Sequence, residues 1–175
     1  MNLPEGVKLS TLKMNIDDRG TFTELLRESW IEHPKFIQWN AVNSEQGILR
    51  GVHVHLKHYD YLTVMRGRIL FALKDLRPDS PTENLSAMVE ISAEKHQSLF
   101  IPPGVAHGFY MLEPSLHIYA VSEYWDMEDE LGCHFADKSL EFSWPDANPR
   151  ISERDLKLPA LSDIRPLIPS FTKTR

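Results

Sequence analysis

The sequence has a single cysteine, Cys133, among its 175 residues. One cysteine cannot form an intrachain disulfide, so a disulfide scaffold is excluded and a reducing compartment is expected. Long apolar runs are also missing, since none approaches the roughly 20 residues that a membrane-spanning helix requires. Residues 1–10 lack the basic region and the apolar core of a signal peptide. We therefore expect a cytoplasmic protein without a membrane partner.

The sequence is also short of positive charge, with 19 lysines and arginines, 25 aspartates and glutamates, and a net charge of −6. A nucleic-acid partner is not expected, because binding to phosphates along a strand needs a concentrated basic surface. An anionic small molecule is still compatible with this charge, since a few arginines in a cleft can dominate the local potential. With 42% hydrophobic residues, the chain can bury the core of one domain, which we assign to residues 1–175.

Helical periodicity is rare, and most segments show the alternation and the β-branched and aromatic residues of strands. Twelve prolines and short polar turns are spread among them, a pattern typical of an antiparallel sandwich or barrel. The predicted strands are 61–76 (interrupted at Gly67), 86–92, 98–103, 107–112 and 116–125. Helical turns are predicted at 127–132 and at 152–158, the latter with Ser152 as N-cap. Residues 163–175 are predicted to form an extended tail, so the fold class is all-β with short C-terminal helical segments.

Histidine is abundant, with eight residues, and two histidine-containing stretches stand out. GILRGVHVHLKHYDYLTVMRG (47–67) and IPPGVAHGF (101–109) follow the spacing of the metal-binding motifs of cupin jelly rolls. The matching residues are Gly47, His53, His55, Asp60, Gly67, Pro102, Gly104 and His107. Cupins usually have glutamate where this chain has Asp60. One divalent transition metal such as Zn, Fe, Ni or Mn would suit the ligands His53, His55, Asp60 and His107; the plainer alternative is a polar lining of the barrel.

A series of motifs in a fixed order extends from about residue 15 to residue 162. They are DDRGTFTELLRESW (17–30), FIQWNAVNSEQGILRGVH (36–53), DLRPDSPT (75–82), VEISAEKHQSLFIPPGVAHGF (89–109), IYAVSEYWDMEDELGCHFADKSLEFSWP (118–145) and PRISERDLKLPAL (149–161). In these motifs the chain resembles the dTDP-4-dehydrorhamnose 3,5-epimerase family, whose fold is a cupin-type jelly-roll barrel. The resemblance implies a homodimeric, cofactor-free isomerase. It would epimerise a dTDP-linked 4-keto-6-deoxyhexose at C3, or at C3 and C5.

The chemistry of such a substrate explains the catalytic residues that the resemblance implies. A ketone at C4 acidifies the protons on C3 and C5, so a base can remove one and leave an enolate. An acid on the opposite face of the ring then completes the inversion. In the family the base is the histidine of R-G-x-H, here His53, and its carboxylate partner in S-x-x-D is Asp155. The acid is the first tyrosine of the Y-x-x-x-x-Y-Y segment, here Tyr119.

The resemblance also implies a set of substrate-binding residues. Arg50 matches an arginine that contacts the diphosphate, a task that suits a guanidinium group. Arg19 and Glu24 belong to an N-terminal segment, residues 1–35, that is expected to contact the partner subunit and help to hold the nucleotide. Gln38 and Asn40 match polar residues near the nucleotide base. Further candidate substrate-binding residues are His55, His107 and Trp125.

Three positions depart from the family's pattern. Asp60 stands where the family has a lysine that can stabilise the enolate oxygen, a role that Lys57 or His58 could take over. His55 replaces a glutamine, and Trp125 replaces the last tyrosine of the tyrosine pair. These departures leave open epimerisation at C3 alone, a sugar-nucleotide 3,4-ketoisomerase, a metal-dependent cupin enzyme such as a dioxygenase, and an inactive module that only binds a sugar nucleotide.

Overall fold

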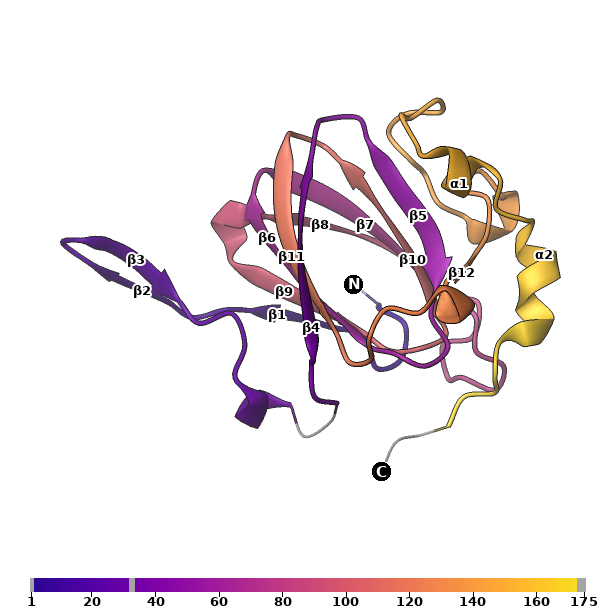
Figure 1. Cartoon of the computed structure of the whole chain (residues 1–175), viewed down its shortest axis with the longest axis horizontal. Coiled ribbons are helices and arrows are strands. Elements are labelled where there is room, and N and C mark those ends of the chain that lie inside the picture. The colour runs from indigo at the N-terminus through magenta and orange to yellow at the C-terminus, as the bar shows by residue number, and fades with distance from the viewer. Residues whose placement is uncertain (1, 32–33, 173–175) are drawn as a thin grey trace.

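Two five-stranded antiparallel sheets face each other in the computed structural model, which describes residues 2–31 and 34–172 (Figure 1). The first sheet has the order β1 (Lys8–Thr11), β9 (Gln97–Ile101), β6 (Asp60–Arg66), β11 (Ser115–Val121) and β4 (Gln38–Ser44). The second has the order β12 (Leu131–Gly132), β5 (Leu49–Val54), β10 (Val105–Met111), β7 (Arg68–Asp75) and β8 (Ser86–Ser92). The prediction of an all-β antiparallel fold is confirmed.

The ends of the strands follow local backbone chemistry. The segment 61–76 divides at Gly67 into β6 and β7, because Gly67 has a φ of +76° and a Cβ there would lie 2.5 Å from the Pro114 carbonyl oxygen. Strand β9 ends at Ile101, two residues before the predicted end, because the prolines at 102 and 103 have no N–H to donate to a neighbouring strand.

The C-terminal third is less regular, as expected, but more firmly packed than predicted. Helix α1 (Glu153–Leu156) lies in the predicted segment, and the Ser152 hydroxyl accepts a hydrogen bond from the Asp155 amide at 3.1 Å. The segment 127–132 instead forms a 3₁₀ turn (Met127–Asp129) followed by β12. Other 3₁₀ turns are Glu28–Trp30, Ala93–Lys95, Lys138–Leu140 and Arg165–Leu167.

The prediction of an extended tail from residue 163 is wrong for its first part. Helix α2 (Leu161–Ile164) continues into the 3₁₀ turn 165–167, and Leu161, Ile164 and Ile168 are buried against the outer face of the second sheet. Their spacing of three and four residues puts them on one side of the helical segment. The Phe171 amide also donates a hydrogen bond to the Pro78 carbonyl oxygen at 2.7 Å.

The two faces of the second sheet therefore have different partners. Its outer face packs against the C-terminal third through Leu49, Val52 and Val54, and its inner face shares a second core with the first sheet around Phe71 and Leu99. The inner core fills only part of the space between the sheets, and the remaining space is lined by polar side chains.

The strands β2 (Met14–Asp17) and β3 (Gly20–Thr23) form a hairpin that projects away from the barrel (Figure 1). Two of its apolar side chains, Ile16 and Phe22, are 70% and 63% exposed. No helix among residues 2–31 and 34–172 has the length and apolar character needed to cross a membrane.

Candidate active site

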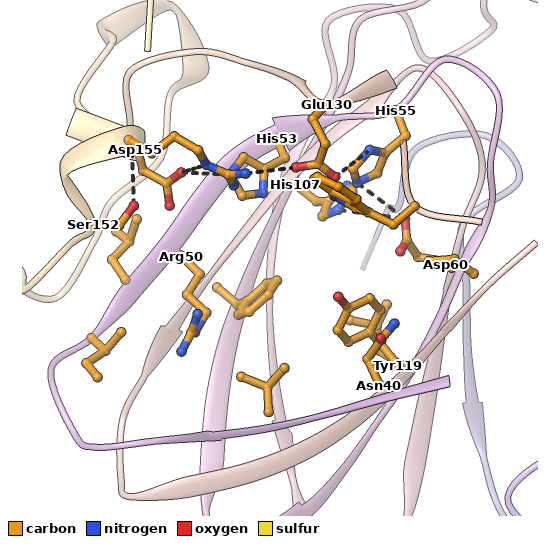
Figure 2. A pocket seen from close by; sticks show the side chains of 18 of the residues that line it. Asn40, Arg50, His53, His55, Asp60, His107, Tyr119, Glu130, Ser152 and Asp155 are labelled. Carbon is orange, nitrogen blue, oxygen red and sulfur yellow. Dashed lines mark hydrogen bonds and ion pairs between the residues drawn. The ribbon is translucent and has the colours of Figure 1, made fainter. Parts of the chain in front are cut away.

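A cavity of about 620 Å³ opens between the two sheets and is lined mostly by residues of β4, β5, β6, β10 and β11 (Figure 2). Alternation along the strands selects the lining, because every second residue of a strand faces the interior. The lining includes Gln38, Asn40, Arg50, His53, His55, His58, Asp60, His107, Phe109, Tyr119, Trp125, Glu130, Arg154 and Asp155. Except for Arg19 and Glu24, all the residues that we predicted for catalysis or substrate binding lie in this one cavity.

A register shift in β5 brings Arg50 and His53 into the cavity together. His53 is paired with His107 and Arg50 with Phe109, so β5 uses one more residue than β10 over the same distance. Without the extra residue, two positions that are three apart would face opposite sides of the sheet. Gly51 allows the shift, because it has a φ of +103° and a Cβ there would lie 2.9 Å from the His107 carbonyl oxygen.

The sequence predicted that His53 and Asp155 act as a pair, and the structure brings them together. The Nε2 N–H of His53 donates to Asp155 Oδ1 at 3.0 Å, and the Gly51 amide donates to Oδ2 at 3.3 Å. Burial disfavours the charged carboxylate, but the hydrogen bond and charge of His53, with the Gly51 amide and Arg154, outweigh it and lower the pKa of Asp155 well below its usual range. The ionised carboxylate holds the proton of His53 on Nε2 and leaves Nδ1 as the basic nitrogen.

Arg154, which the sequence did not single out, extends this pair. Its side chain is 57% exposed and contacts Asp155 Oδ1 at 3.2 Å and Glu130 Oε2 at 3.4 Å. It also lies 3.0 Å from His53 Nε2, a contact that is not a hydrogen bond while Nε2 carries the proton. Its position directly before Asp155 was visible in the sequence, but a single arginine in a helical turn gives no signal of its direction.

Tyr119 approaches the cavity from the opposite sheet. It lies on β11 beside Asn40 of β4, whereas the His53–Asp155 pair belongs to the β5 side (Figure 2). Burial raises the pKa of the Tyr119 hydroxyl, and the negative charges of Asp60 and Glu130 raise it further. Tyr119 therefore keeps its proton at neutral pH, as a proton donor must.

Arg50 marks a separate part of the cavity, away from Asp60 (Figure 2). Its guanidinium donates to the Ser44 hydroxyl from two nitrogens, each at 3.2 Å. Gln38 binds the side chain of Asn40 at 3.1 Å and accepts a hydrogen bond from the Trp125 amide at 3.0 Å, while the Trp125 side chain is 51% exposed. The Gln38–Trp125 contact links the edge strand β4 to the loop after β11.

Arg19 and Glu24 do not line the cavity of their own chain. Arg19 lies in the projecting hairpin, where its side chain is 85% exposed and pairs with Asp17 at 2.5 Å. Glu24 pairs with Arg27 just after the hairpin. Any contact of these two residues with a nucleotide would have to be made in another subunit.

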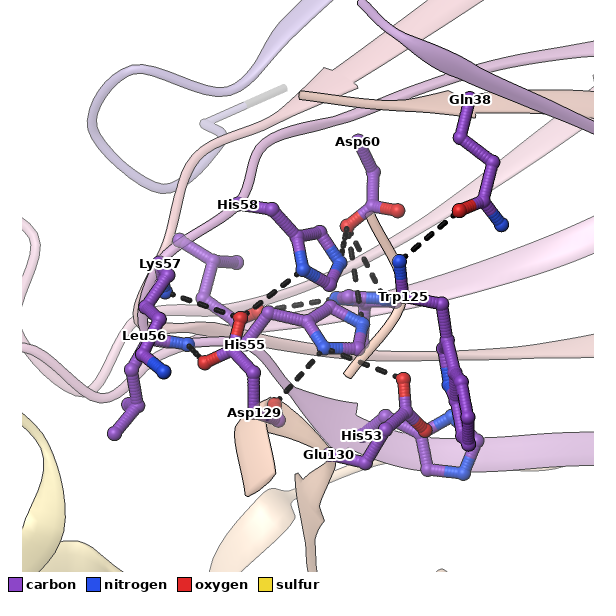
Figure 3. A network of polar contacts seen from close by, with 12 residues as sticks. Gln38, His53, His55, Leu56, Lys57, His58, Asp60, Trp125, Asp129 and Glu130 are labelled. Atoms are coloured by element: carbon purple, nitrogen blue, oxygen red, sulfur yellow. Dashed lines mark hydrogen bonds and ion pairs between the residues drawn. The ribbon is translucent and has the colours of Figure 1, made fainter. Parts of the chain in front are cut away.

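A second cluster in the same cavity is made of His55, His58, Asp60 and His107, all of which are buried (Figure 2 for His107, Figure 3 for the others). Burial lowers the pKa of all three histidines, that of His107 to about 3, and burial also raises the pKa of Asp60 well above its usual value. Of the four metal ligands suggested by sequence, three (His55, Asp60 and His107) each have a ligand atom within 4.8 Å of the others. His53 is held by Asp155, and His58 takes its place beside Asp60.

Two acidic residues near this cluster were missed in the sequence. Asp129 and Glu130 lie in a segment that was expected to be a helical turn, and nothing in its pattern showed that they face inward. Asp129 binds the amides of Leu56 and Lys57 at 2.8 and 3.3 Å. Of the two suggested replacements for the family's lysine, Lys57 is exposed and outside the cavity lining, whereas His58 is part of it.

Comparison with known proteins agrees with the geometry. The family model for dTDP-4-dehydrorhamnose 3,5-epimerase matches residues 3–163. A dTDP-4-dehydrorhamnose 3,5-epimerase of Shigella flexneri is 33% identical over 149 residues, which are 80% of this chain and 82% of the relative.

Two solved structures have the same fold. The dTDP-6-deoxy-D-glucose-3,5-epimerase of Legionella pneumophila, in complex with dTDP-4-keto-L-rhamnose, has a TM-score of 0.87 and 29% identity, covering 95% of this chain and 94% of that one. ChmJ of Streptomyces bikiniensis, a 3'-monoepimerase in complex with dTDP-quinovose, has a TM-score of 0.87 and 27% identity, covering 95% and 90%. The predictions of a cupin-type jelly roll and of an isomerase are confirmed, and the chain belongs to the dTDP-4-dehydrorhamnose 3,5-epimerase family.

Proposed function

We propose that this enzyme epimerises a dTDP-linked 4-keto-6-deoxyhexose at C3, with or without C5, by proton transfer through an enolate. The observation that carries the proposal is the placement of a histidine–carboxylate pair and a protonated tyrosine on opposite sheets, facing one cavity. Inversion at carbon needs a base on one face of the sugar ring and an acid on the other, and this arrangement offers both.

His53 is the base in this mechanism. Its Nδ1 takes the proton from the carbon next to the ketone, and the charge that develops on the imidazole is stabilised by Asp155 at 3.0 Å. Tyr119 delivers a proton from the opposite wall and inverts the centre. The proton transfers use only side chains of the chain itself, so they need no organic cofactor.

The remaining substrate-binding assignments follow the shape of the cavity. Arg50 binds the diphosphate, and Gln38, Asn40 and Trp125 contact the nucleotide or the sugar at the end of the cavity formed by β4. His55 and His107 line the wall around the reacting part of the sugar. Trp125 donates through its ring N–H and is a poor proton source, so its presence favours inversion at C3 over inversion at C5.

Arg19 and Glu24 take part through a homodimer. The hairpin of β2 and β3 carries exposed Ile16 and Phe22 and extends beyond its own barrel, which supports a role for the N-terminal segment 1–35 in covering the cavity of the partner subunit. We place the enzyme in the cytoplasm, where sugar nucleotides are made and a single unpaired cysteine is stable.

The test is solvent deuterium uptake by dTDP-4-keto-6-deoxyglucose in heavy water, resolved by carbon. Wild-type protein and a Lys57→Gln variant, which changes an exposed side chain beside the cavity, are expected to label C3 at similar rates. Label at C3 alone identifies a monoepimerase, and label at both carbons a 3,5-epimerase. Absence of label at both carbons with full binding of the sugar nucleotide would overturn the proposal in favour of a binding module.

A further inference from the structure

We propose that His55, His58, His107 and Asp60 bind one divalent transition metal ion of the zinc class in the cavity. The first observation is that three histidines surround a single atom, with His55 and His58 labelled in Figure 3 and His107 in Figure 2. The Nε2 atoms of the three histidines lie 3.9, 3.8 and 3.8 Å from the same carboxylate oxygen, Asp60 Oδ2. These residues come from separate parts of the chain, namely the loop between β5 and β6, the start of β6, and β10.

The orientation of the three rings is the second observation. His58 Nδ1 is 3.0 Å from Asp129 Oδ2, His55 Nδ1 is 3.3 Å from the Asp129 carbonyl oxygen, and His107 Nδ1 is 3.1 Å from the Val105 carbonyl oxygen. A carbonyl or carboxylate oxygen only accepts, so each Nδ1 carries the hydrogen and each Nε2 presents a lone pair. Metal-binding histidines are held in this way, with the second nitrogen donating to a carboxylate or a backbone carbonyl.

These two observations together call for a cation. Three Nε2 lone pairs around one carboxylate oxygen, at distances too long for hydrogen bonds, leave room between them for a cation that all four atoms can coordinate. Ligand atoms about 2.0–2.1 Å from a tetrahedral zinc ion lie about 3.3 Å from each other. One ligand atom each of His55, Asp60 and His107 already lies within 4.8 Å of the other two, whereas His58 Nε2, 3.8 Å from Asp60 Oδ2, must move further to join them. Three imidazoles and one carboxylate suit Zn²⁺, Fe²⁺ or Mn²⁺ better than Ca²⁺ or Mg²⁺.

Asp129 is excluded from the ligand set by its own contacts, and His53 by its distance from the other ligands. The ligand atoms of His55, His58 and Asp129 also lie within 4.8 Å of one another. However, both carboxylate oxygens of Asp129 are already used, one by the Leu56 amide and the other by His58 Nδ1 and the Lys57 amide. Asp129 therefore orients His58 as a positioning residue. The ring nitrogens of His53 are not within 4.8 Å of all the ligand atoms of His55, Asp60 and His107. Its Nε2 donates to Asp155, and its Nδ1 stays available as a base while the metal is bound.

The location suggests what the ion does for the reaction, and this part rests on the proposed function. Asp60 stands where the family's pattern has a lysine that can stabilise the enolate oxygen. A metal held by Asp60 and the three histidines would put positive charge back at that place in the cavity. With four protein ligands in place, such an ion would have to take a carbonyl oxygen as a fifth ligand in order to polarise it as a Lewis acid.

Metal binding can be tested without any substrate. Protein freed of metal by dialysis against a chelator is titrated with Zn²⁺ by calorimetry and with Co²⁺ by visible absorption. We expect one equivalent per chain, with the intense absorption of four-coordinate Co²⁺. The double variant His58→Asn/His107→Asn is expected to lose at least about 100-fold in affinity, and Asp129→Asn about 10–100-fold. His96→Asn is the matched control, because it changes a histidine outside the cavity at a left-handed position that asparagine tolerates.

Wild-type protein that binds less than stoichiometric metal would overturn the proposal, and this measurement does not depend on any variant being folded. Equal affinity in the wild type and the double variant would also overturn it, as would a loss on His53→Asn equal to the loss in the double variant. Deuterium uptake by metal-free and reloaded protein then tests the role separately. Equal deuterium uptake by the metal-free and the reloaded protein would show that the metal has no role in the reaction. No uptake by either form would overturn the proposed epimerisation, but it would not affect the result of the metal titration.

Discussion

Two buried aspartates of this enzyme have opposite surroundings. Asp75, at the end of β7, is fully buried and receives hydrogen bonds from the Arg77 guanidinium at 2.8 Å to each oxygen, from Ser80 at 2.6 Å and from Thr82 at 2.7 Å. Asp60, at the start of β6, is 4% exposed and has three imidazole nitrogens around one oxygen at 3.8–3.9 Å, too far for hydrogen bonds.

The difference separates a structural network from a functional one. Burial raises the pKa of both carboxyls, but the bonds from Arg77, Ser80 and Thr82 reverse this for Asp75, whose pKa is lowered, whereas the pKa of Asp60 stays well above its usual value. A buried group with all its partners stabilises one conformation, whereas a buried group that lines a cavity and lacks them can still bind water or a ligand. The cavity around Asp60 is therefore where ligands are expected, and the Asp75 network is where stability is expected.

The largest effect should come from replacing the base in the cavity. His53→Asn is expected to lower kcat for epimerisation about 10²–10⁴-fold, because the amide cannot accept a proton near neutral pH. Thermal unfolding should change little by comparison, since His53 is only partly buried. Steady-state kinetics beside the His96→Asn control give the measurement, and a decrease of less than tenfold would assign the base to another residue.

Tyr119→Phe should separate proton removal from inversion. The variant keeps the ring and its packing but cannot donate a proton, so an enolate formed by His53 can only be reprotonated from the side it came from. We expect deuterium uptake at C3 to continue while net inversion falls about 100-fold. Nuclear magnetic resonance of the recovered sugar nucleotide distinguishes the two, and parallel losses of uptake and inversion would argue that Tyr119 binds the substrate instead.

For the Asp75 network the prediction concerns stability. Asp75→Asn leaves the Arg77 guanidinium buried without a full partner, so the free energy of unfolding should fall by about 3–5 kcal/mol. The folded variant should retain its kcat, because Asp75 is not part of the cavity lining. Urea unfolding provides the measurement, with the exposed Asp79→Asn as control at a left-handed position that asparagine tolerates. A loss below about 1 kcal/mol would show that the network contributes little.

The sequence predicted the fold and the proton-transfer residues for a clear reason. Strand alternation, a local property, predicted the all-β fold, and the family resemblance of the motifs implied roles for His53, Tyr119 and Asp155 before the structure showed that the histidine and the aspartate meet. The roles of His58 and Asp129 were not predictable in this way. They depend on how the loop between β5 and β6 packs on the turn Met127–Asp129, a long-range contact with no periodic pattern. The tail was misjudged because three apolar side chains in a proline-rich segment gave too weak a helical pattern.

The smallest effect concerns His117, a buried histidine on β11 that is fully inaccessible to solvent. Within residues 2–31 and 34–172, neither of its ring nitrogens has a hydrogen-bond partner. Burial, and to a lesser extent the charge of Arg50, lowers the pKa of His117 to about 4. Below about pH 6.5 the unfolded chain therefore takes up a proton that the folded protein does not, and stability falls from that pH down to about 4.

His117→Leu should remove this part of the pH dependence. At pH 7.5 both forms of His117 are neutral, and the variant should be close to wild type in stability. The free energy of unfolding of the variant minus that of the wild type should be about 2 kcal/mol larger at pH 5.0 than at pH 7.5, since about 1.4 kcal/mol corresponds to one pKa unit. Asp75 acts in a different range: its lowered pKa gives stability above its unfolded value of 3.8 that is lost only as the pH falls below it. Urea unfolding at both pH values checks the prediction for His117→Leu. If the free energy of unfolding changed equally between the two pH values in wild type and variant, His117 would have to be protonated while folded.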